Sequence, residues 1–159
     1  MELAEIVDRV RSYRGVARKV PVVSVARELI PASSGAIIAA HGEDAAAIRH
    51  GKEVLLLAAD GIVQDLVDRD PGWAGYCSVL VNANDIAAMG GIPVAAVNVL
   101  SCGDPEVRRS IVKGMRAACD KLGVPMVGGH LHPDTSYSAV AVAMLGRTTP
   151  SRLVLSSGA

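Results

Sequence analysis

The sequence has 159 residues, half of them hydrophobic and a fifth charged, which indicates one folded domain and excludes a disordered chain. Its 16 basic and 16 acidic residues cancel, and aromatic residues make up only 3% of the chain. Because nucleic-acid binding requires a basic face or stacking rings, we expect no nucleic-acid partner.

Residues 1–35 are expected to form a helical arm ahead of the main domain. Helical spacing of apolar residues predicts a helix over residues 2–12 and a shorter one over residues 24–29. Lys19 lies with a neighbouring arginine in the proline-broken segment between them. Two interpretations stay open for this pair: solvated side chains in a loop, or cations of a mobile arm that reach an anion.

Residues 36–148 are expected to form an α/β domain, in which helices cover one face of a sheet. In the last strand, the alternating alanines at 139, 141 and 143 are expected to receive a helix. Residues 149–159 are expected to begin a linker to a missing C-terminal domain. The predicted strands are 37–40, 45–49, 54–59, 92–100, 124–127 and 138–145, and the predicted helices are 73–89 and 104–123.

The helix that ends before Gly90 is unusual because it combines small or apolar residues with two polar ones. A helix without a clearly polar face is normally buried on most sides. Asn82 and Asp85 are three residues apart and therefore lie on one face of it. Since burial of an ionised carboxylate is strongly unfavourable without a partner, we expect a partner or a metal opposite Asp85.

Three carboxylates share one context, a lone acidic residue at the end or the buried side of an apolar element: Asp44, Asp60 and Asp85. Each alone also fits a structural role, in a turn or as a hydrogen-bond acceptor. Together they would repel one another unless a cation lay between them. Hard oxygen ligands of this kind suit Mg²⁺, which typically bridges carboxylates to phosphates.

The glycine pair Gly128-Gly129 offers backbone that can approach a phosphate, because no Cβ intervenes. The sequence has neither a P-loop nor a dinucleotide fingerprint, which excludes the familiar nucleotide folds. Another possibility stays open for His130 and His132, since residues two apart on a strand point the same way. With Asp134 they would make a two-histidine, one-carboxylate set for Zn²⁺ or Fe²⁺.

The three cysteines are odd in number and form no C-x-x-C pair, so we expect reduced thiols in a cytoplasmic protein. No apolar run approaches the roughly 18–20 residues that span a bilayer. The acidic, polar N-terminus does not match a signal peptide. We therefore expect no membrane association.

Four blocks of the sequence resemble, in order and spacing, the ATP-binding half of the AIR synthase (PurM-like) superfamily. This group includes aminoimidazole ribonucleotide synthetase, selenophosphate synthetase and thiamine-monophosphate kinase. Residues 70–79 and 123–135 look most like the methanogenesis marker protein 2 group. The four blocks are Gly42-Glu-Asp-Ala-Ala46, Ala58-Ala-Asp-Gly61, Asn82-Ala-Asn-Asp-Ile-Ala-Ala-Met-Gly90 and Gly128-Gly-His130.

The resemblance implies a mixed sheet, covered on one face by helices, that pairs with its twin to close a β-barrel in a homodimer. It implies ATP at the dimer interface and phosphoryl transfer to an oxygen or similar nucleophile of an unknown small-molecule or protein acceptor. The candidate Mg²⁺ ligands are Asp44, Asp60 and Asp85, and the candidate cofactor-binding residues are Asn82, Gly128, Gly129, His130 and Lys19.

Two departures from the family pattern bear on activity. The usual Asp-Asp pair is Glu43-Asp44, and the usual Thr-Thr-Asp is Ala58-Ala59-Asp60, which loses two hydroxyls. The family's C-terminal domain, which helps to form the substrate cleft, is also missing, so the chain alone is expected to be inactive. The alternative function is a non-catalytic dimerisation or assembly module in cofactor or metalloenzyme maturation.

Overall fold

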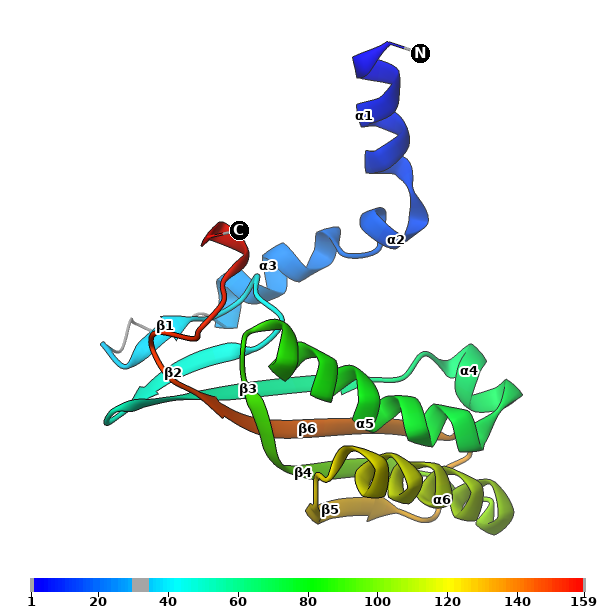
Figure 1. Ribbon diagram of the computed structural model, residues 1–159. Helices are drawn as coiled ribbons and strands as arrows, with labels where there is room; N and C mark the ends of the chain where they lie inside the picture. The colour runs from blue at the N-terminus through cyan, green and yellow to red at the C-terminus, as the bar shows by residue number, and fades with distance from the viewer. Residues whose placement is uncertain (1, 30–34, 159) are drawn as a thin grey trace. The chain divides into compact units, whose positions relative to one another are not determined.

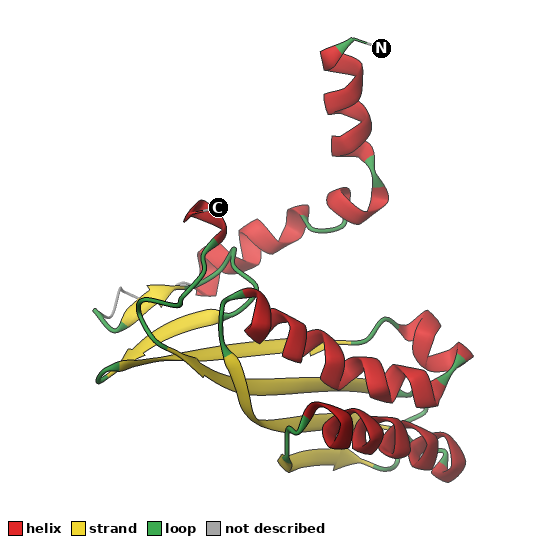
Figure 2. Ribbon diagram, in the orientation of Figure 1, coloured by secondary structure: helices red, strands yellow, loops and turns green. Residues whose placement is uncertain are grey.

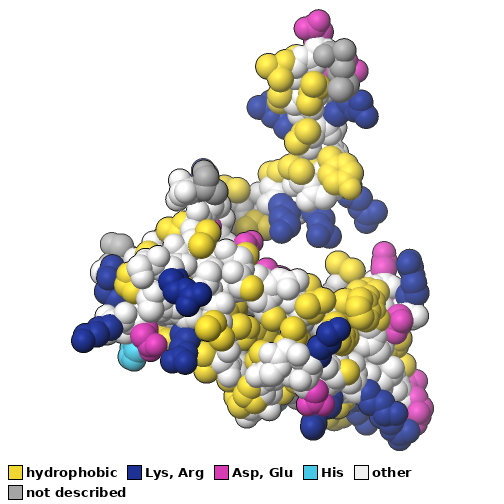
Figure 3. Space-filling view, in the orientation of Figure 1, with side chains coloured by type: hydrophobic (Ala, Val, Ile, Leu, Met, Phe, Trp, Pro, Cys, Tyr) yellow, Lys and Arg dark blue, Asp and Glu magenta, His cyan; other side chains and the backbone are white. Residues whose placement is uncertain are grey.

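The computed structural model describes residues 2–29 and 35–158, and the chain divides into two compact units, Met1–Gly35 and Ala36–Ala159. The first unit consists of three helices, α1 (Leu3–Ser12), α2 (Arg14–Ala17) and α3 (Val20–Leu29). None of its described residues is buried, and apolar side chains from all three helices lie on its surface (Figure 3). The helices predicted over 2–12 and 24–29 are confirmed, although the second begins earlier, at Val20.

The second unit is a six-stranded mixed sheet in the order β1-β2-β3-β6-β4-β5, with α5 and α6 on one face (Figures 1 and 2). All neighbouring strands are antiparallel except β4 and β5, which are parallel and joined through α6. The predicted arrangement, helices covering one face of a sheet, is confirmed. Its elements are β1 Ile37–Ala39, β2 Ala46–His50, β3 Glu53–Gly61, α4 Gln64–Arg69, α5 Pro71–Ala88, β4 Ile92–Ser101, α6 Pro105–Leu122, β5 Met126–His132, β6 Ala139–Thr148 and the 3₁₀ helix η1 Ser156–Gly158.

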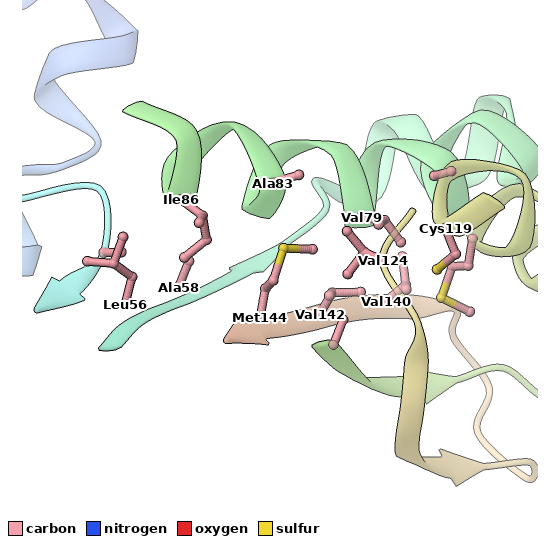
Figure 4. Close-up of a cluster of buried hydrophobic side chains, with 14 of the residues drawn as sticks. Leu56, Ala58, Val79, Ala83, Ile86, Cys119, Val124, Val140, Val142 and Met144 are labelled. Carbon is pink, nitrogen blue, oxygen red and sulfur yellow. The ribbon is translucent and has the colours of Figure 1, made fainter. Parts of the chain in front are cut away.

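The core of this unit fills the space between the sheet and α5 (Figure 4). Alternate residues of each central strand face the helices, as the two-residue period of a strand requires. Within the described ranges, no helix combines the length and the apolar character that crossing a bilayer requires. The buried core side chains labelled in Figure 4 include Leu56 and Ala58 of β3, Val140, Val142 and Met144 of β6, and Val79, Ala83 and Ile86 of α5.

Helix α6 has the sequence-predicted boundaries because both of its ends are capped. The Asp104 carboxylate accepts hydrogen bonds from the backbone N–H groups of Glu106 (2.8 Å) and Val107 (3.1 Å). Gly123 ends the helix in the left-handed conformation, at φ +67°. These caps satisfy backbone groups that a helix end otherwise leaves unpaired.

The predicted role of the alanine face of β6 is wrong. The side that α5 covers carries Val140, Val142 and Met144, whereas the alanines are half-buried on the opposite face. Helix α5 itself presents many small residues to the sheet, so longer strand side chains are needed to fill the layer at normal packing density. The alanines therefore line a sheet face that no helix of this unit covers (Figure 1).

Two other elements differ from the prediction. Strand β5, expected to end at 127, continues to His132, because its backbone pairs in parallel with β4 as far as Ser101. The glycine pair therefore lies in a strand, although glycine has a low strand propensity. The polar region before α5 also contains a helix, α4, which the sequence pattern did not predict.

The C-terminal segment, residues 149–158, is fastened to the end of α5. Leu153 and Leu155 pack against the core, and the Val154 N–H donates to the carbonyl of Met89 at 3.2 Å. Gly90 has φ +71°, and a Cβ there would lie 2.1 Å from the carbonyl oxygen of Arg152. The segment is therefore anchored to the core and to the end of α5.

Candidate magnesium and nucleotide site

Asp44 lies in a loop that is held from both sides. On one side, the Glu43 carboxylate accepts hydrogen bonds from the backbone N–H and the hydroxyl of Ser156, both at 2.9 Å. On the other side, the buried Ala45 N–H donates to the sulfur of Met89 at 3.0 Å. Asp44 itself is exposed. The fold therefore presents its carboxylate to solvent on an ordered loop.

Asp85 lies in the last turns of α5 and is half-buried. Helix α6 packs against the flank of α5 that carries Gly72 and Tyr76, and the helical period places Asp85 on roughly the opposite flank. The Met89 N–H donates to the Asp85 carbonyl at 3.3 Å, and the Met89 sulfur accepts from the residue after Asp44. Asp44 and Asp85 therefore lie at the same end of α5.

Asp60 is the penultimate residue of β3 and is exposed. It continues the series of alternate β3 residues that face the helices, directly after the buried Ala58. Strand β2 runs antiparallel to β3 with Ala46 opposite Leu57, so Asp44 lies off the same end of this strand pair as Asp60. Asp44 thus shares the end of α5 with Asp85 and the end of the β2–β3 pair with Asp60.

The three carboxylates do not form a closed metal site within one chain. Across residues 2–29 and 35–158, no three His, Cys, Asp or Glu side chains converge in a group that could hold a metal ion. The donor set nevertheless fits Mg²⁺, which keeps several waters and usually takes one or two carboxylates together with phosphate oxygens. If bound with a nucleotide, the ion would neutralise phosphate charge, and its carboxylate ligands would come from Asp44, Asp60 and Asp85.

Asn82 occupies a different environment from Asp85. Its side chain is fully buried, and its amide nitrogen donates to the Ser78 carbonyl at 2.9 Å. In the described part of the chain its amide oxygen has no hydrogen-bond partner. A buried acceptor without a donor costs about 1–3 kcal/mol. Asn82 is therefore not accessible to a ligand at the surface of this chain.

The glycine pair and His130 lie at the opposite edge of the sheet from Asp44. Strand β5 is three strands away from β3 in the sheet order, a separation of roughly 14 Å at the usual strand spacing. One chain therefore does not bring Gly128, Gly129 and His130 together with the carboxylates. A ligand that touches both groups would have to be long or would have to lie between two chains.

The two glycines differ in the free space around their Cα atoms. A Cβ on Gly129 would lie 2.1 Å from the side-chain oxygen of Asn98, so close packing on β4 accounts for that glycine. A Cβ on Gly128 would make only an ordinary contact, 3.6 Å from Val97. Space for a backbone approach therefore exists at Gly128, whereas the side chain of Asn98 already fills it at Gly129.

His130 and His132 are both exposed on β5, with ring centroids 4.5 Å apart and an interplanar angle of 67°. Asp134 does not complete a three-ligand set with them, as no such group exists in the parts of the chain that the structure describes. The last predicted ligand, Lys19, is exposed between α2 and α3 in the first unit.

Sequence reasoning missed the contacts that hold the carboxylate-bearing loop, namely those of Glu43 with Ser156 and of Ala45 with Met89. Both join residues far apart in the chain, by 113 and 44 positions. The sequence signal for the contact with Ser156 was Glu43 itself, which stands where the family pattern has aspartate.

A mixed sheet with helices on one face and a carboxylate-bearing loop at the end of the long helix define an AIR synthase type of N-terminal domain. The chain belongs to the family described as AIR synthase related protein, N-terminal domain, which it matches over residues 42–148.

Several known proteins are similar to it in sequence. An uncharacterized protein of Methanocaldococcus jannaschii is 40% identical over 92% of this chain and 46% of its own length. An uncharacterized protein of Synechocystis is 47% identical over 67% of this chain and 33% of its own length. Selenide, water dikinase of Sulfurimonas denitrificans is 31% identical over 75% of this chain and 35% of its own length. The chain thus spans less than half the length of these relatives.

Solved structures share the fold. PurL of Thermotoga maritima, solved in complex with ATP, gives a TM-score of 0.71 at 22% identity over 84% of this chain and 24% of that chain. Thiamine monophosphate kinase of Aquifex aeolicus gives 0.67 at 21% identity over 86% of this chain and 44% of that chain. At these identities the likeness concerns the fold alone.

Proposed function

We propose that the chain is the ATP- and Mg²⁺-binding N-terminal domain of an enzyme that transfers a phosphoryl group from ATP to an oxygen or similar nucleophile. The observation that carries this proposal is that Asp44 shares the end of α5 with Asp85 and the end of the β2–β3 pair with Asp60. Phosphoryl transfer depends mainly on positioning and charge neutralisation, which carboxylate-bound Mg²⁺ provides. The family, the selenide, water dikinase relatives and the ATP complex of a protein with the same fold support the same class of reaction.

We further propose that the nucleotide lies between two copies of the chain. The sheet face opposite the helices exposes apolar side chains, including Leu57, Val97, Val99 and Leu145. Pairing of two such faces would bury them and would close the sheets into a barrel. It would also offer a route by which β5 of one copy could approach the carboxylates of the other.

A thermal-shift series tests the nucleotide site. A ligand at about 100 times its dissociation constant stabilises a fold by roughly 2.7 kcal/mol. We expect the melting temperature to rise with ATP plus Mg²⁺, and the rise to vanish in Asp60→Asn and Asp85→Asn. Asp65→Asn, which changes an exposed carboxylate of α4, is the matched control and should keep the rise.

The second candidate function is a non-catalytic dimerisation or assembly module. It is favoured by Ala58 and Ala59, which replace two hydroxyls of the family pattern, and by the apolar sheet face. The absence of any shift with ATP plus Mg²⁺, in a protein that is dimeric, would favour this module over phosphoryl transfer. A shift with Zn²⁺ alone that is lost in His130→Ala would instead favour the paired histidines.

A further inference from the structure

Glu43 joins two parts of the chain that are far apart in sequence. Each of its carboxylate oxygens accepts one hydrogen bond at 2.9 Å, from the N–H and the hydroxyl of Ser156. Hydrogen bonds to an ionised acceptor are about twice as strong as neutral ones. Glu43 is also half-buried, so water competes less for its oxygens than it would on an open surface. The pair therefore acts as a clamp between the loop and the C-terminal segment.

The clamp closes a ring of contacts around Asp44. Ser156 follows closely after Val154, whose N–H donates to the Met89 carbonyl at 3.2 Å. Met89 in turn accepts, at its sulfur, the N–H of Ala45 at 3.0 Å. Both residues flanking Asp44 are thus tied, directly or through the C-terminal segment, to the end of α5 that carries Asp85.

The length of the Glu43 side chain matters for this geometry. Aspartate is shorter by one methylene, about 1.3–1.5 Å, and would leave its oxygens too far from Ser156 for hydrogen bonds unless the backbone moved. The glutamate that departs from the family's acidic pair is therefore the side chain that reaches the C-terminal segment of this chain.

We propose that Glu43 is a positioning residue, which fixes Asp44 relative to Asp85 through its clamp on Ser156 and does not itself bind the metal. This inference rests on the magnesium and nucleotide function proposed above. It assigns to the C-terminal segment a part in forming the site, although none of that segment's residues is a predicted ligand.

The substitution Glu43→Asp, which restores the family's Asp-Asp pair, tests whether Glu43 positions the site or binds the metal directly. In Glu43→Asp and Ser156→Ala we expect the dissociation constant for Mg²⁺ with AMPPCP, measured by calorimetry on the full chain, to rise about three- to tenfold, the range that the net contribution of one typical hydrogen bond supports. Because both changes break one clamp, the double variant should bind no worse than the poorer single one. Ser151→Ala, whose hydroxyl forms a hydrogen bond with Thr149 and with no other described residue, is the control and should bind as the wild type does.

Hydrogen exchange of the Ala45 amide in the nucleotide-free protein tests the clamp independently. We expect exchange to speed up about tenfold or more in Glu43→Asp and Ser156→Ala, and to stay unchanged in Ser151→Ala. Unchanged exchange would overturn the inference. So would Glu43→Asp binding as tightly as the wild type, since a direct ligand tolerates aspartate and a clamp does not.

The two proposals fail in distinguishable ways. A wild-type chain that binds no Mg²⁺ with AMPPCP would refute the nucleotide function. The exchange measurement would still decide whether Glu43 holds the loop that carries Asp44.

Discussion

At the scale of single residues, the attachment of the C-terminal segment depends on a glycine where two backbone segments meet. Gly90 has φ +71°, and a Cβ added to it would lie only 2.1 Å from the Arg152 carbonyl oxygen. A side chain there would have to displace the C-terminal segment, which also carries the clamp on Glu43. Stability and the geometry of the candidate site are therefore coupled at this residue.

Gly90→Ala should lower the free energy of unfolding by about 3 kcal/mol or more, because it adds a backbone clash to the strain of a left-handed alanine. Gly51→Ala is the matched control: its φ is +60°, but open space surrounds it. It should lose only about 1–2 kcal/mol. Urea denaturation measures both, and equal losses would show that the contact with Arg152 contributes nothing.

Cys119 predicts a dependence of stability on pH. Burial, and then the negative charge of Asp120, raise the pKa of its thiol above the ordinary value. The thiol therefore ionises more readily in the unfolded chain, so the free energy of unfolding should fall as the pH rises above about 8.5. Cys119→Ala should show a shallower fall in denaturant titrations between about pH 7 and 10, and an unchanged slope would contradict this cause.

At the scale of elements, α5 and α6 form a layer in which two helix backbones touch. A Cβ on Gly75 would lie 2.0 Å from the Ile111 carbonyl oxygen, and one on Gly114 would lie 1.9 Å from that of Gly72. The sequence showed the capped, amphipathic α6 but not this crossing. Close contact fixes the direction of α5, and hence where its last turns place Asp85.

Gly114→Ala should destabilise the fold by about 2–3 kcal/mol, although alanine favours a helix, because the two backbones must separate. Gly72→Ala is the control at the same crossing. Its nearest neighbour would be the Ser110 hydroxyl at 3.2 Å, which can rotate away. Thermal denaturation compares the two, and equal stability of the two variants would refute backbone contact as the cause.

At the scale of the whole molecule, two features lead us to expect pairing with a second chain. One is the sheet face that no helix of the second unit covers, and the other is the distance between the two groups of candidate site residues. Val97 and Val99 are 43% and 49% exposed on a face that no helix of the second unit covers. Asp44 and Asp60 border the β2–β3 part of the sheet, whereas Gly128 lies on the edge strand β5. A second chain would cover the apolar face and could supply the groups that the first places too far away.

If two chains pair through the sheet as proposed, Val99→Lys should shift the protein from dimer to monomer in sedimentation velocity at micromolar concentration, because a buried unpaired ammonium opposes association. Val112→Lys is the matched control, since this residue of α6 is 47% exposed on the helical side. It should leave the dimer intact. A wild-type monomer, or equal behaviour of the two variants, would contradict pairing through the sheet.

What the sequence determined by itself was local. Strand alternation, the caps of α6 and the apolar character of α5 gave the class of fold and the position of most elements, because each depends on residues near one another in the chain. The four family blocks likewise pointed to Asp44, Asp60 and Asp85.

Only the tertiary structure decided which face of β6 the helices cover, that β5 extends through the glycine pair, and that Glu43 is held by Ser156. Each depends on a partner brought close by the fold: the bulk needed under α5, the backbone of β4, and a segment 113 residues away. Such contacts leave no periodic signal in a single sequence, because packing and not spacing selects the partner.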